Sequence, residues 1–168
     1  KEAADLILTD DNFATIISAV EEGRRIYDNI LKSIQFLISS NVGEIITLFT
    51  VIMATPLIAT WFGIENLGLI EALLPIHILW VNLVTDSLPA LALSVEPAEK
   101  NIMRRKARKI GNQVFTKGMT WRIGYQGIMI ATLTLTAFIL GLVTTEGANE
   151  EIRVGVAQTM AFAVLAIS

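Results

Sequence analysis

Long apolar stretches divide the chain into segments with the length of membrane-spanning helices. Three of them contain no lysine or arginine and at most one acid each: residues 33–64, 72–95 and 123–145. A helix of about 20 apolar residues crosses the hydrocarbon core of a bilayer, so each stretch is long enough. Residues 154–168 form a further uncharged stretch. The pattern therefore predicts an all-α membrane protein fragment.

The same pattern predicts a helical bundle of four transmembrane segments, the last one truncated. A long cytoplasmic stalk helix is expected to continue into the first segment. In chain order, the predicted segments are residues 1–12 (tail of a cytoplasmic phosphorylation domain and hinge), 13–33 (stalk helix), 34–62 (transmembrane span), 63–71 (external loop), 72–95 (transmembrane span with a proline-interrupted helix), 96–117 (basic cytoplasmic loop), 118–143 (transmembrane span), 144–153 (external loop) and 154–168 (start of a further transmembrane span).

The first residues are expected to be a short piece of a larger cytoplasmic domain. ADLILTDDNF is typical of a buried strand followed by a turn, and a strand without partner strands does not fold alone. Asp10, Asp11 or Asn12 can cap the helix that follows. From about Phe13 the apolar positions recur at helical spacing, and residues 28–40 contain no strong helix breaker. We therefore expect one unbroken helix from the cytoplasm into the membrane.

Composition and charge support a membrane protein and predict its orientation. Of the 168 residues, 53% are hydrophobic and 17% are charged, which is more apolar than a typical soluble domain. Twelve of the 13 lysines and arginines precede the first apolar stretch or lie within residues 96–122. By the positive-inside rule, the N-terminus and the 96–117 loop are expected to be cytoplasmic, although the membrane itself is not specified. The expected partner of this loop is the lipid bilayer and not nucleic acid.

The second apolar stretch has a polar face in its middle. Asn82, Thr85, Asp86 and Pro89 are spaced i, i+3, i+4 and i+7, so they fall within about 100° of one another on a helix. Pro89 has no N–H, which deprives the Thr85 carbonyl of its helical partner and pushes the turn open. Because an unpaired carbonyl is costly in lipid, this turn is expected to face protein, water or an ion.

The first apolar stretch has a matching polar stripe, within about 120° on a helical wheel. Its members are Ser33, Ser40, Asn41, Glu44 and Thr47. Together the two faces offer carboxylates, amide oxygens, hydroxyls and a freed carbonyl. Such hard oxygen donors suit Ca²⁺, which takes about six to eight oxygens, better than Zn²⁺ or Cu⁺. The candidate metal ligands are Asn41, Glu44, Asn82, Thr85 and Asp86.

Each of these polar residues also has a structural explanation. A single Asn, Ser or Thr in a membrane helix commonly hydrogen-bonds to a neighbouring helix or to its own backbone. A carboxylate in mid-span costs roughly 2.5–3.5 kcal/mol on insertion, which favours a functional site. A purely structural pairing of Glu44 and Asp86 stays open as the alternative. No residue is predicted to be catalytic or to bind a cofactor.

Three stretches of the chain resemble type II P-type cation-transporting ATPases, in particular the Ca²⁺-transporting, sarco/endoplasmic-reticulum-like branch. They are LTDDNFATIISAVEEGRRIYDNI, FLISSNVGEII and LLPIHILWVNLVTDSLPALALSVEP. The resemblance is dense over residues 1–105 and looser beyond. It identifies the chain as the C-terminal membrane portion of such a pump, with the hinge, the stalk and two ion-binding helices.

The resemblance also implies ligand roles. It assigns Asn41 and Glu44, with Thr85 and Asp86, to one Ca²⁺ site. It assigns Asn82 and Asp86 to a second site, so that Asp86 bridges both. Whether the intact protein binds one Ca²⁺ or two stays open.

The implied function is that of an ATP-driven pump that exports Ca²⁺ from the cytoplasm. The phosphorylated aspartate and the sites for ATP and Mg²⁺ would lie in the remaining domains of the same pump, so the chain alone is not expected to be catalytic. Proton countertransport is expected, because two carboxylates in an apolar site favour protonation once Ca²⁺ has left. The alternatives are a pump for Na⁺, K⁺ or H⁺, a passive cation channel, and a structural membrane module without activity.

Overall fold

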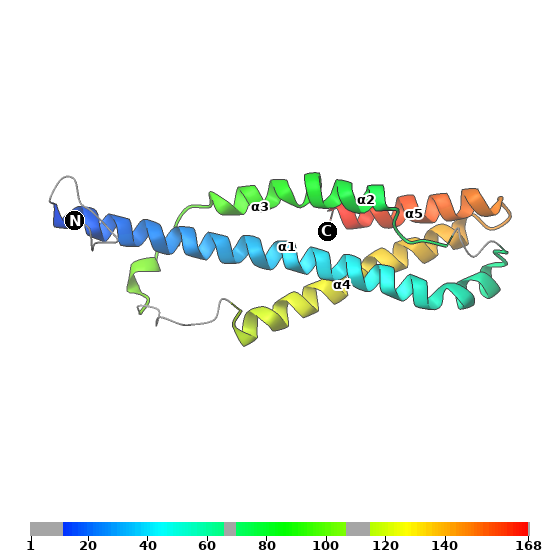
Figure 1. Cartoon of the computed structure of the whole chain (residues 1–168), viewed down its shortest axis with the longest axis horizontal. Helices are drawn as coiled ribbons and strands as arrows, with labels where there is room; N and C mark the ends of the chain where they lie inside the picture. The colour runs from blue at the N-terminus through cyan, green and yellow to red at the C-terminus, as the bar shows by residue number, and fades with distance from the viewer. Residues whose placement is uncertain (1–11, 66–69, 107–114, 168) are drawn as a thin grey trace, which may run out of the picture.

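Every regular element in the described residues is a helix. The computed structural model describes residues 12–65, 70–106 and 115–167, and its longer helices extend along one long axis (Figure 1). The elements are α1 (Phe13–Phe62), α2 (Pro75–Trp80), the π-helix η2 (Val81–Thr85), α3 (Ser87–Ser94), the 3₁₀ helix η3 (Ile102–Arg104), α4 (Lys117–Thr144) and α5 (Glu150–Ile167). The predicted all-α fold is confirmed. The strand expected near the start of the chain lies outside the described residues.

The first helix is continuous over 50 residues, from Phe13 to Phe62. Asn12 caps its start, because the side-chain oxygen accepts a hydrogen bond from the Ala14 N–H at 3.0 Å. Gly63 ends it in the left-handed conformation, at φ 63°, which glycine adopts without strain. At 1.5 Å per residue the helix is about 75 Å long, more than twice the thickness of a hydrocarbon core. The predicted long N-terminal helix is therefore confirmed.

Helix α4 crosses α1 at a point where both helices carry glycine. A Cβ atom on Gly43 would lie 2.7 Å from Ile130 Cγ2, and one on Gly127 would lie 2.5 Å from Val42 Cγ1. Both distances are too short for real side-chain contacts, so the two backbones can approach only because these positions have no side chain. Gly43 directly precedes Glu44, and the crossing therefore sets the position of Glu44 relative to α4.

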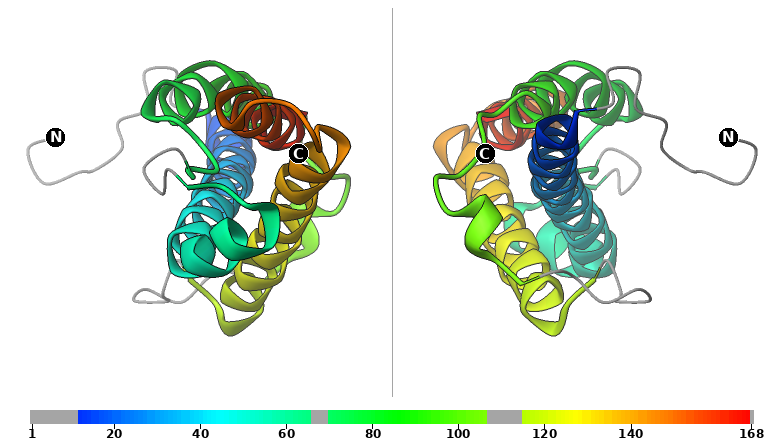
Figure 2. Two further views of the ribbon diagram at one scale, coloured as in Figure 1. Left: turned by 90° about the vertical axis from the view of Figure 1, so that its right-hand side faces the viewer. Right: turned by 90° about the vertical axis from the view of Figure 1, so that its left-hand side faces the viewer.

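The segment α2–η2–α3 lies along α1, while α5 packs against α4 and also contacts η2. The views along the long axis show these rods grouped around a shared interior (Figure 2). Its most deeply buried apolar side chains include Val51, Val81, Phe138, Leu142 and Ala161. The candidate polar faces of α1 and η2 are thereby held within one bundle.

Side chains of the N-terminal half of α1 hydrogen-bond to the end of α3 and to the backbone beyond it. The buried Asn29 amide donates to the Ser94 carbonyl at 3.2 Å and to the Glu96 carbonyl at 2.8 Å. Closer to the N-terminus, the Arg24 guanidinium donates to the Ile102 carbonyl at 2.9 Å. These bonds satisfy carbonyls at and beyond the end of α3, which have no helical partners of their own. They tie α1 to the far end of the segment that carries Asp86.

A buried arginine joins three helices at the opposite end of the bundle. Arg153 of α5 is only 7% exposed, and its guanidinium donates to the Phe62 carbonyl at 2.6 Å and to the Leu142 carbonyl at 3.4 Å. It also lies 5.7 Å from the centre of the Phe62 ring, within the range of a cation–π contact. A cation is favourable here, because the C-terminal ends of α1 and α4 carry partial negative charge.

By length and composition, three helical segments in the described residues could cross a membrane. They are Phe13–Phe62, Pro75–Ser94 and Lys117–Thr144. Helix α5 has 18 residues, with Glu150, Glu151 and Arg153 among its first four, and it is not one of the three. It forms the fourth rod of the bundle, and its role as the start of a further span stays a prediction.

The glycine contact predicts a large effect from a single methyl group. Gly127→Ala should lower the stability of the full-length protein by roughly 1–3 kcal/mol, because the new Cβ overlaps Val42. Gly124→Ala is the matched control, since a Cβ three residues earlier on the same helix would meet nothing within 4 Å. The thermal unfolding midpoint in detergent measures both. Equal midpoints for the two variants would contradict the close crossing.

The Arg153 contacts predict a graded series of substitutions. Arg153→Gln should lower the unfolding midpoint by an amount equivalent to roughly 1–3 kcal/mol, because it removes the charged donor from two carbonyls. Arg153→Lys should fall between this variant and the wild type, since it keeps the charge but not the planar fork. Arg104→Gln, at an exposed position, is the control and should unfold like the wild type. An unfolding midpoint of Arg153→Gln equal to that of the wild type would contradict a stabilising role of the Arg153 contacts.

Candidate cation site

The second set of candidate ligands lies on a wide turn that interrupts the helix. The Asp86 N–H donates to the Val81 carbonyl, five residues earlier, at 2.8 Å, which is the spacing of a π-helix. Pro89 has no N–H for the Thr85 carbonyl, and regular bonding resumes with the Ala90 N–H, which donates to the Asp86 carbonyl at 3.2 Å. The sequence indicated an opened turn at Thr85, and the structure has five residues of wide turn that end there.

Glu44 and Asn82 meet between α1 and η2. The Asn82 Nδ2 atom lies 3.3 Å from Glu44 Oε1 and 3.1 Å from Oε2, and it also donates to the Ile78 carbonyl at 3.0 Å. Glu44 is only 4% exposed. Burial of a carboxylate is costly unless donors or a cation offset it. The structure thus brings two candidate residues from different helices into direct contact.

Asp86 faces the same stripe of α1 one turn away from Glu44. It is 4% exposed, and the Ser40 side chain lies close to its carboxyl group. Within the described part of the chain, its Oδ2 atom is buried and has no hydrogen-bond partner. Its charge also acts on Glu44 by electrostatic repulsion. Two neighbouring buried carboxylates with an unsatisfied oxygen create a region of strongly negative electrostatic potential, which a cation or protons would neutralise.

The last two candidates contribute less direct contacts. The Thr85 hydroxyl donates to the Val81 carbonyl within its own turn at 2.8 Å, which leaves its oxygen lone pairs free to accept or to coordinate. Asn41 is half-buried on α1, three residues before Glu44. Its amide makes no hydrogen bond to any other described residue. Both side chains therefore keep an oxygen that could serve a cation.

The donor set decides which class of ion fits. No group of three or more His, Cys, Asp or Glu side chains close enough to hold a metal occurs in residues 12–65, 70–106 and 115–167. The oxygens near Glu44 and Asp86 come instead from two carboxylates, amides and hydroxyls. Such a mixture suits a hard, multiply coordinated cation such as Ca²⁺ and offers none of the nitrogen and sulfur that Zn²⁺ or Cu⁺ prefer.

Sequence reasoning did not include every residue that shapes this site. Ser40 belonged to the polar stripe of the first span but was not among the candidate ligands, although it contacts Asp86. Its signal was the helical position, one turn before Glu44. Thr47, on the same stripe, is fully buried, and its hydroxyl donates to the Gly43 carbonyl of its own helix at 2.8 Å, as the Thr85 hydroxyl does to Val81.

Comparison with known proteins shows the family. The family described as "Cation transporting ATPase, C-terminus" matches residues 70–168. Over its whole length the chain is 46% identical to "Calcium-transporting ATPase 1" of Bacillus cereus and 44% identical to "Calcium-transporting ATPase" of Bacillus subtilis, of which it covers 18% and 17%. Over 83% of its length it is 44% identical to "Endoplasmic reticulum calcium ATPase srcA" of Aspergillus fumigatus, of which it covers 13%. The chain spans less than a fifth of the length of these relatives. It belongs to the cation-transporting ATPase family and corresponds to the C-terminal membrane portion of such proteins.

Proposed function

We propose that the chain is the ion-binding membrane part of an ATP-driven pump that exports Ca²⁺ from the cytoplasm. The observation that carries the proposal is the pair of buried carboxylates, Glu44 and Asp86, on two facing helices, with Asp86 Oδ2 left without a partner among the described residues. The names of the relatives, all Ca²⁺-transporting ATPases, support Ca²⁺ as the cargo. Ca²⁺ is here the transported substrate and not a resident cofactor.

The proposed ligands are Asn41, Glu44, Asn82, Thr85 and Asp86. Asn82 would have to turn its amide oxygen toward the ion, because its nitrogen donates to both Glu44 oxygens. Binding would therefore exchange one hydrogen-bonded contact between α1 and η2 for a shared ion. Such an exchange makes the separation of the two helices sensitive to the ion, which is what a transport cycle requires.

The stalk offers a physical route from the cytoplasmic domains to the site. One unbroken helix carries Asn29, which binds the end of the α3 segment, and Glu44 four turns later. ATP and Mg²⁺ would act in the other domains of the same pump, and a shift of the stalk would reach both helices of the site together. Rigid elements that move between two arrangements are a common means of coupling distant sites. The lipid bilayer and these domains are the proposed partners.

Two other functions compete with this proposal. A pump for Na⁺, K⁺ or H⁺ could use the same oxygens, because the geometry does not fix the cargo by itself. A passive cation channel would also need acidic side chains within the membrane. The continuous 50-residue helix favours a pump, since a passive pore needs no rigid connection to a cytoplasmic domain.

Substitution of the two carboxylates tests the proposed site. In the full-length protein, Asp86→Asn should reduce ATP-driven ⁴⁵Ca²⁺ uptake at low Ca²⁺ by at least about tenfold, because a charged ligand is worth roughly 1.5–3 kcal/mol. Glu44→Gln should also weaken uptake, and the larger its effect, the stronger the case for two sites. The exposed Glu151→Gln variant is the charge-matched control. Uptake by Asp86→Asn at the wild-type level would refute the central assignment.

Phosphorylation and leak assays separate the competing functions. Formation of a phosphorylated intermediate from ATP should depend on Ca²⁺ and should not be supported by Na⁺ or K⁺. Vesicles that contain the protein should retain Ca²⁺ when ATP is absent. Phosphorylation driven by Na⁺ or K⁺ would indicate another cargo, and rapid Ca²⁺ leak without ATP would indicate a channel.

Charge balance at the site predicts proton movement opposite to Ca²⁺. After Ca²⁺ leaves, Glu44 and Asp86 would remain buried close together, and proton uptake would remove their repulsion. In sealed vesicles with the cytoplasmic face outward, ATP-driven Ca²⁺ uptake should therefore raise the luminal pH reported by a trapped dye. The cytoplasmic face of the protein is here the one that carries the N-terminus and the 96–117 loop in the proposed topology. Ca²⁺ uptake with no opposite proton flux at any pH would exclude countertransport.

A further inference from the structure

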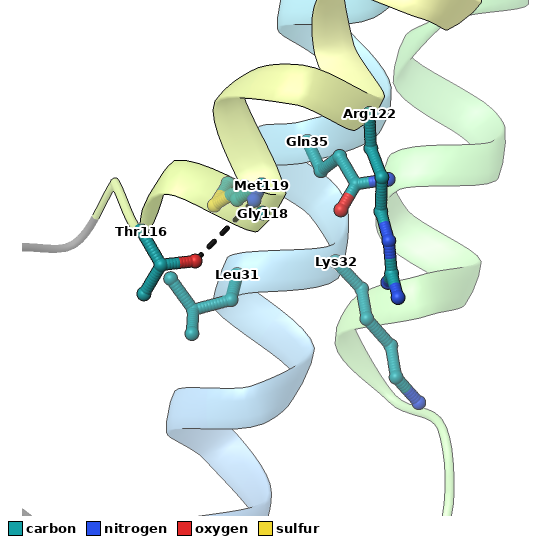
Figure 3. A pocket seen from close by; sticks show the side chains of 7 residues that line it. All are labelled: Leu31, Lys32, Gln35, Thr116, Gly118, Met119 and Arg122. Atoms are coloured by element: carbon teal, nitrogen blue, oxygen red, sulfur yellow. Dashed lines mark hydrogen bonds between the residues drawn. The ribbon is translucent and has the colours of Figure 1, made fainter.

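Two adjacent cavities lie between α1 and the N-terminal half of α4. The larger one also reaches Leu93 of α3 and Ser40, the α1 residue beside Asp86. The cavity volumes are about 280 Å³ and about 450 Å³, close to the range of ligand-binding pockets, roughly 300–1,000 Å³. They share three lining residues, Lys32, Gln35 and Arg122, and Figure 3 shows the side chains around the smaller one. We refer to the two cavities together as the α1–α4 pocket.

The shared part of the pocket is positively charged. Arg122 extends from α4 beside Gln35 and toward Lys32 (Figure 3), and in the described part of the chain it forms no hydrogen bond or ion pair. Lys32 is partly neutralised, because its Nζ lies 2.6 Å from Glu96 Oε2. No acidic side chain is among the described residues that line either cavity. The net charge offered to a ligand is therefore positive, and most of it comes from Arg122.

The start of α4 adds to this positive potential. Thr116, Gly118 and Met119 line the smaller cavity, and they belong to the cap and the first turn of a 28-residue helix. The Thr116 hydroxyl accepts from the Met119 N–H at 3.3 Å, while the first N–H groups of any helix have no helical acceptor. The N-terminal end of a helix also carries partial positive charge, so an anionic oxygen is favoured here.

The larger cavity becomes apolar away from the two cations. Phe36, Met129 and Leu133 form part of its wall. The Gln126 oxygen, also in this wall, accepts hydrogen bonds from the Gln35 side chain and from the Ser39 hydroxyl, both at 3.1 Å. These polar groups are thus satisfied by one another and do not call for a polar ligand. The pocket combines a cationic end with an apolar interior.

The pocket lies where a membrane-spanning α4 would enter the lipid. Trp121 and Tyr125 flank Arg122 on this helix and are 78% and 62% exposed, and exposed Trp and Tyr are typical of the membrane–water interface. We propose that the α1–α4 pocket binds an anionic phospholipid, with the phosphate group at Arg122 and the start of α4 and part of an acyl chain against the apolar wall. The orientation proposed above places this site in the cytoplasmic leaflet, which is the leaflet rich in anionic lipid.

Lipid retention tests this site without a transport measurement. The lipid proposal can therefore fail while the pump proposal stands, and the pump proposal can fail while the lipid proposal stands. The full-length protein, reconstituted in phosphatidylcholine with phosphatidylglycerol and extracted in mild detergent, is analysed by native mass spectrometry. The wild type should retain phosphatidylglycerol in preference to phosphatidylcholine. Arg122→Gln should reduce this retention about tenfold, because the charged hydrogen bonds to phosphate are lost. Arg104→Gln, at an exposed basic position that does not line the α1–α4 pocket, should retain it.

A second variant and a competitor locate the ligand. Gly118→Leu should also reduce retention, since a Cβ at Gly118 meets nothing within 4 Å and the new side chain can occupy the smaller cavity. Millimolar inorganic phosphate should displace little of the lipid, because it gains nothing from the apolar wall. Wild-type retention by Arg122→Gln or by Gly118→Leu would overturn the proposal. Displacement by inorganic phosphate would also overturn it, since the site would then bind a free anion.

Discussion

Two carboxylates inside an apolar bundle are the constraint on which the rest of the structure depends. Each costs roughly 2.5–3.5 kcal/mol to place in mid-membrane, and Glu44 and Asp86 are both 4% exposed. Asn82 offsets part of this cost, because its amide donates from η2 to both Glu44 oxygens on α1. One buried oxygen, Oδ2 of Asp86, has no hydrogen-bond partner among the described residues. A bound cation would offset the cost of burying it.

The surrounding elements hold these groups at a fixed separation. Close packing at Gly43 and Gly127 sets where α1 meets α4, and a five-residue wide turn sets where Asp86 faces α1. Arg153 joins the helix ends at one side of the bundle, while Asn29 joins α1 to the end of the α3 segment at the other. A displacement of the N-terminal part of α1 would therefore reach Glu44 and the segment that carries Asp86 together.

Much of this arrangement could be predicted from sequence, because helical periodicity is a local property. The unbroken first helix, a cap among Asp10, Asp11 and Asn12, and the polar faces that carry Glu44 and Asn82 follow from spacing and residue type. The direct contact between Glu44 and Asn82 was not predicted. Contacts that depend on which helices meet could not be derived in this way. The roles of Gly127 and Arg153 require the crossing of α4 and the position of α5, and the length of the wide turn depends on packing as well as on Pro89. The ligand roles of the five candidate residues are still predictions.

A structure of the full-length protein with bound Ca²⁺ tests the central claim most directly. The account predicts an ion between α1 and η2, with Asp86 and Glu44 oxygens at about 2.3–2.6 Å, the usual range for Ca²⁺, and with the Asn82 amide turned so that its oxygen faces the ion. A Ca²⁺ ion bound elsewhere in the membrane region, with Asn82 still donating to Glu44 and with Asp86 uncoordinated, would contradict it.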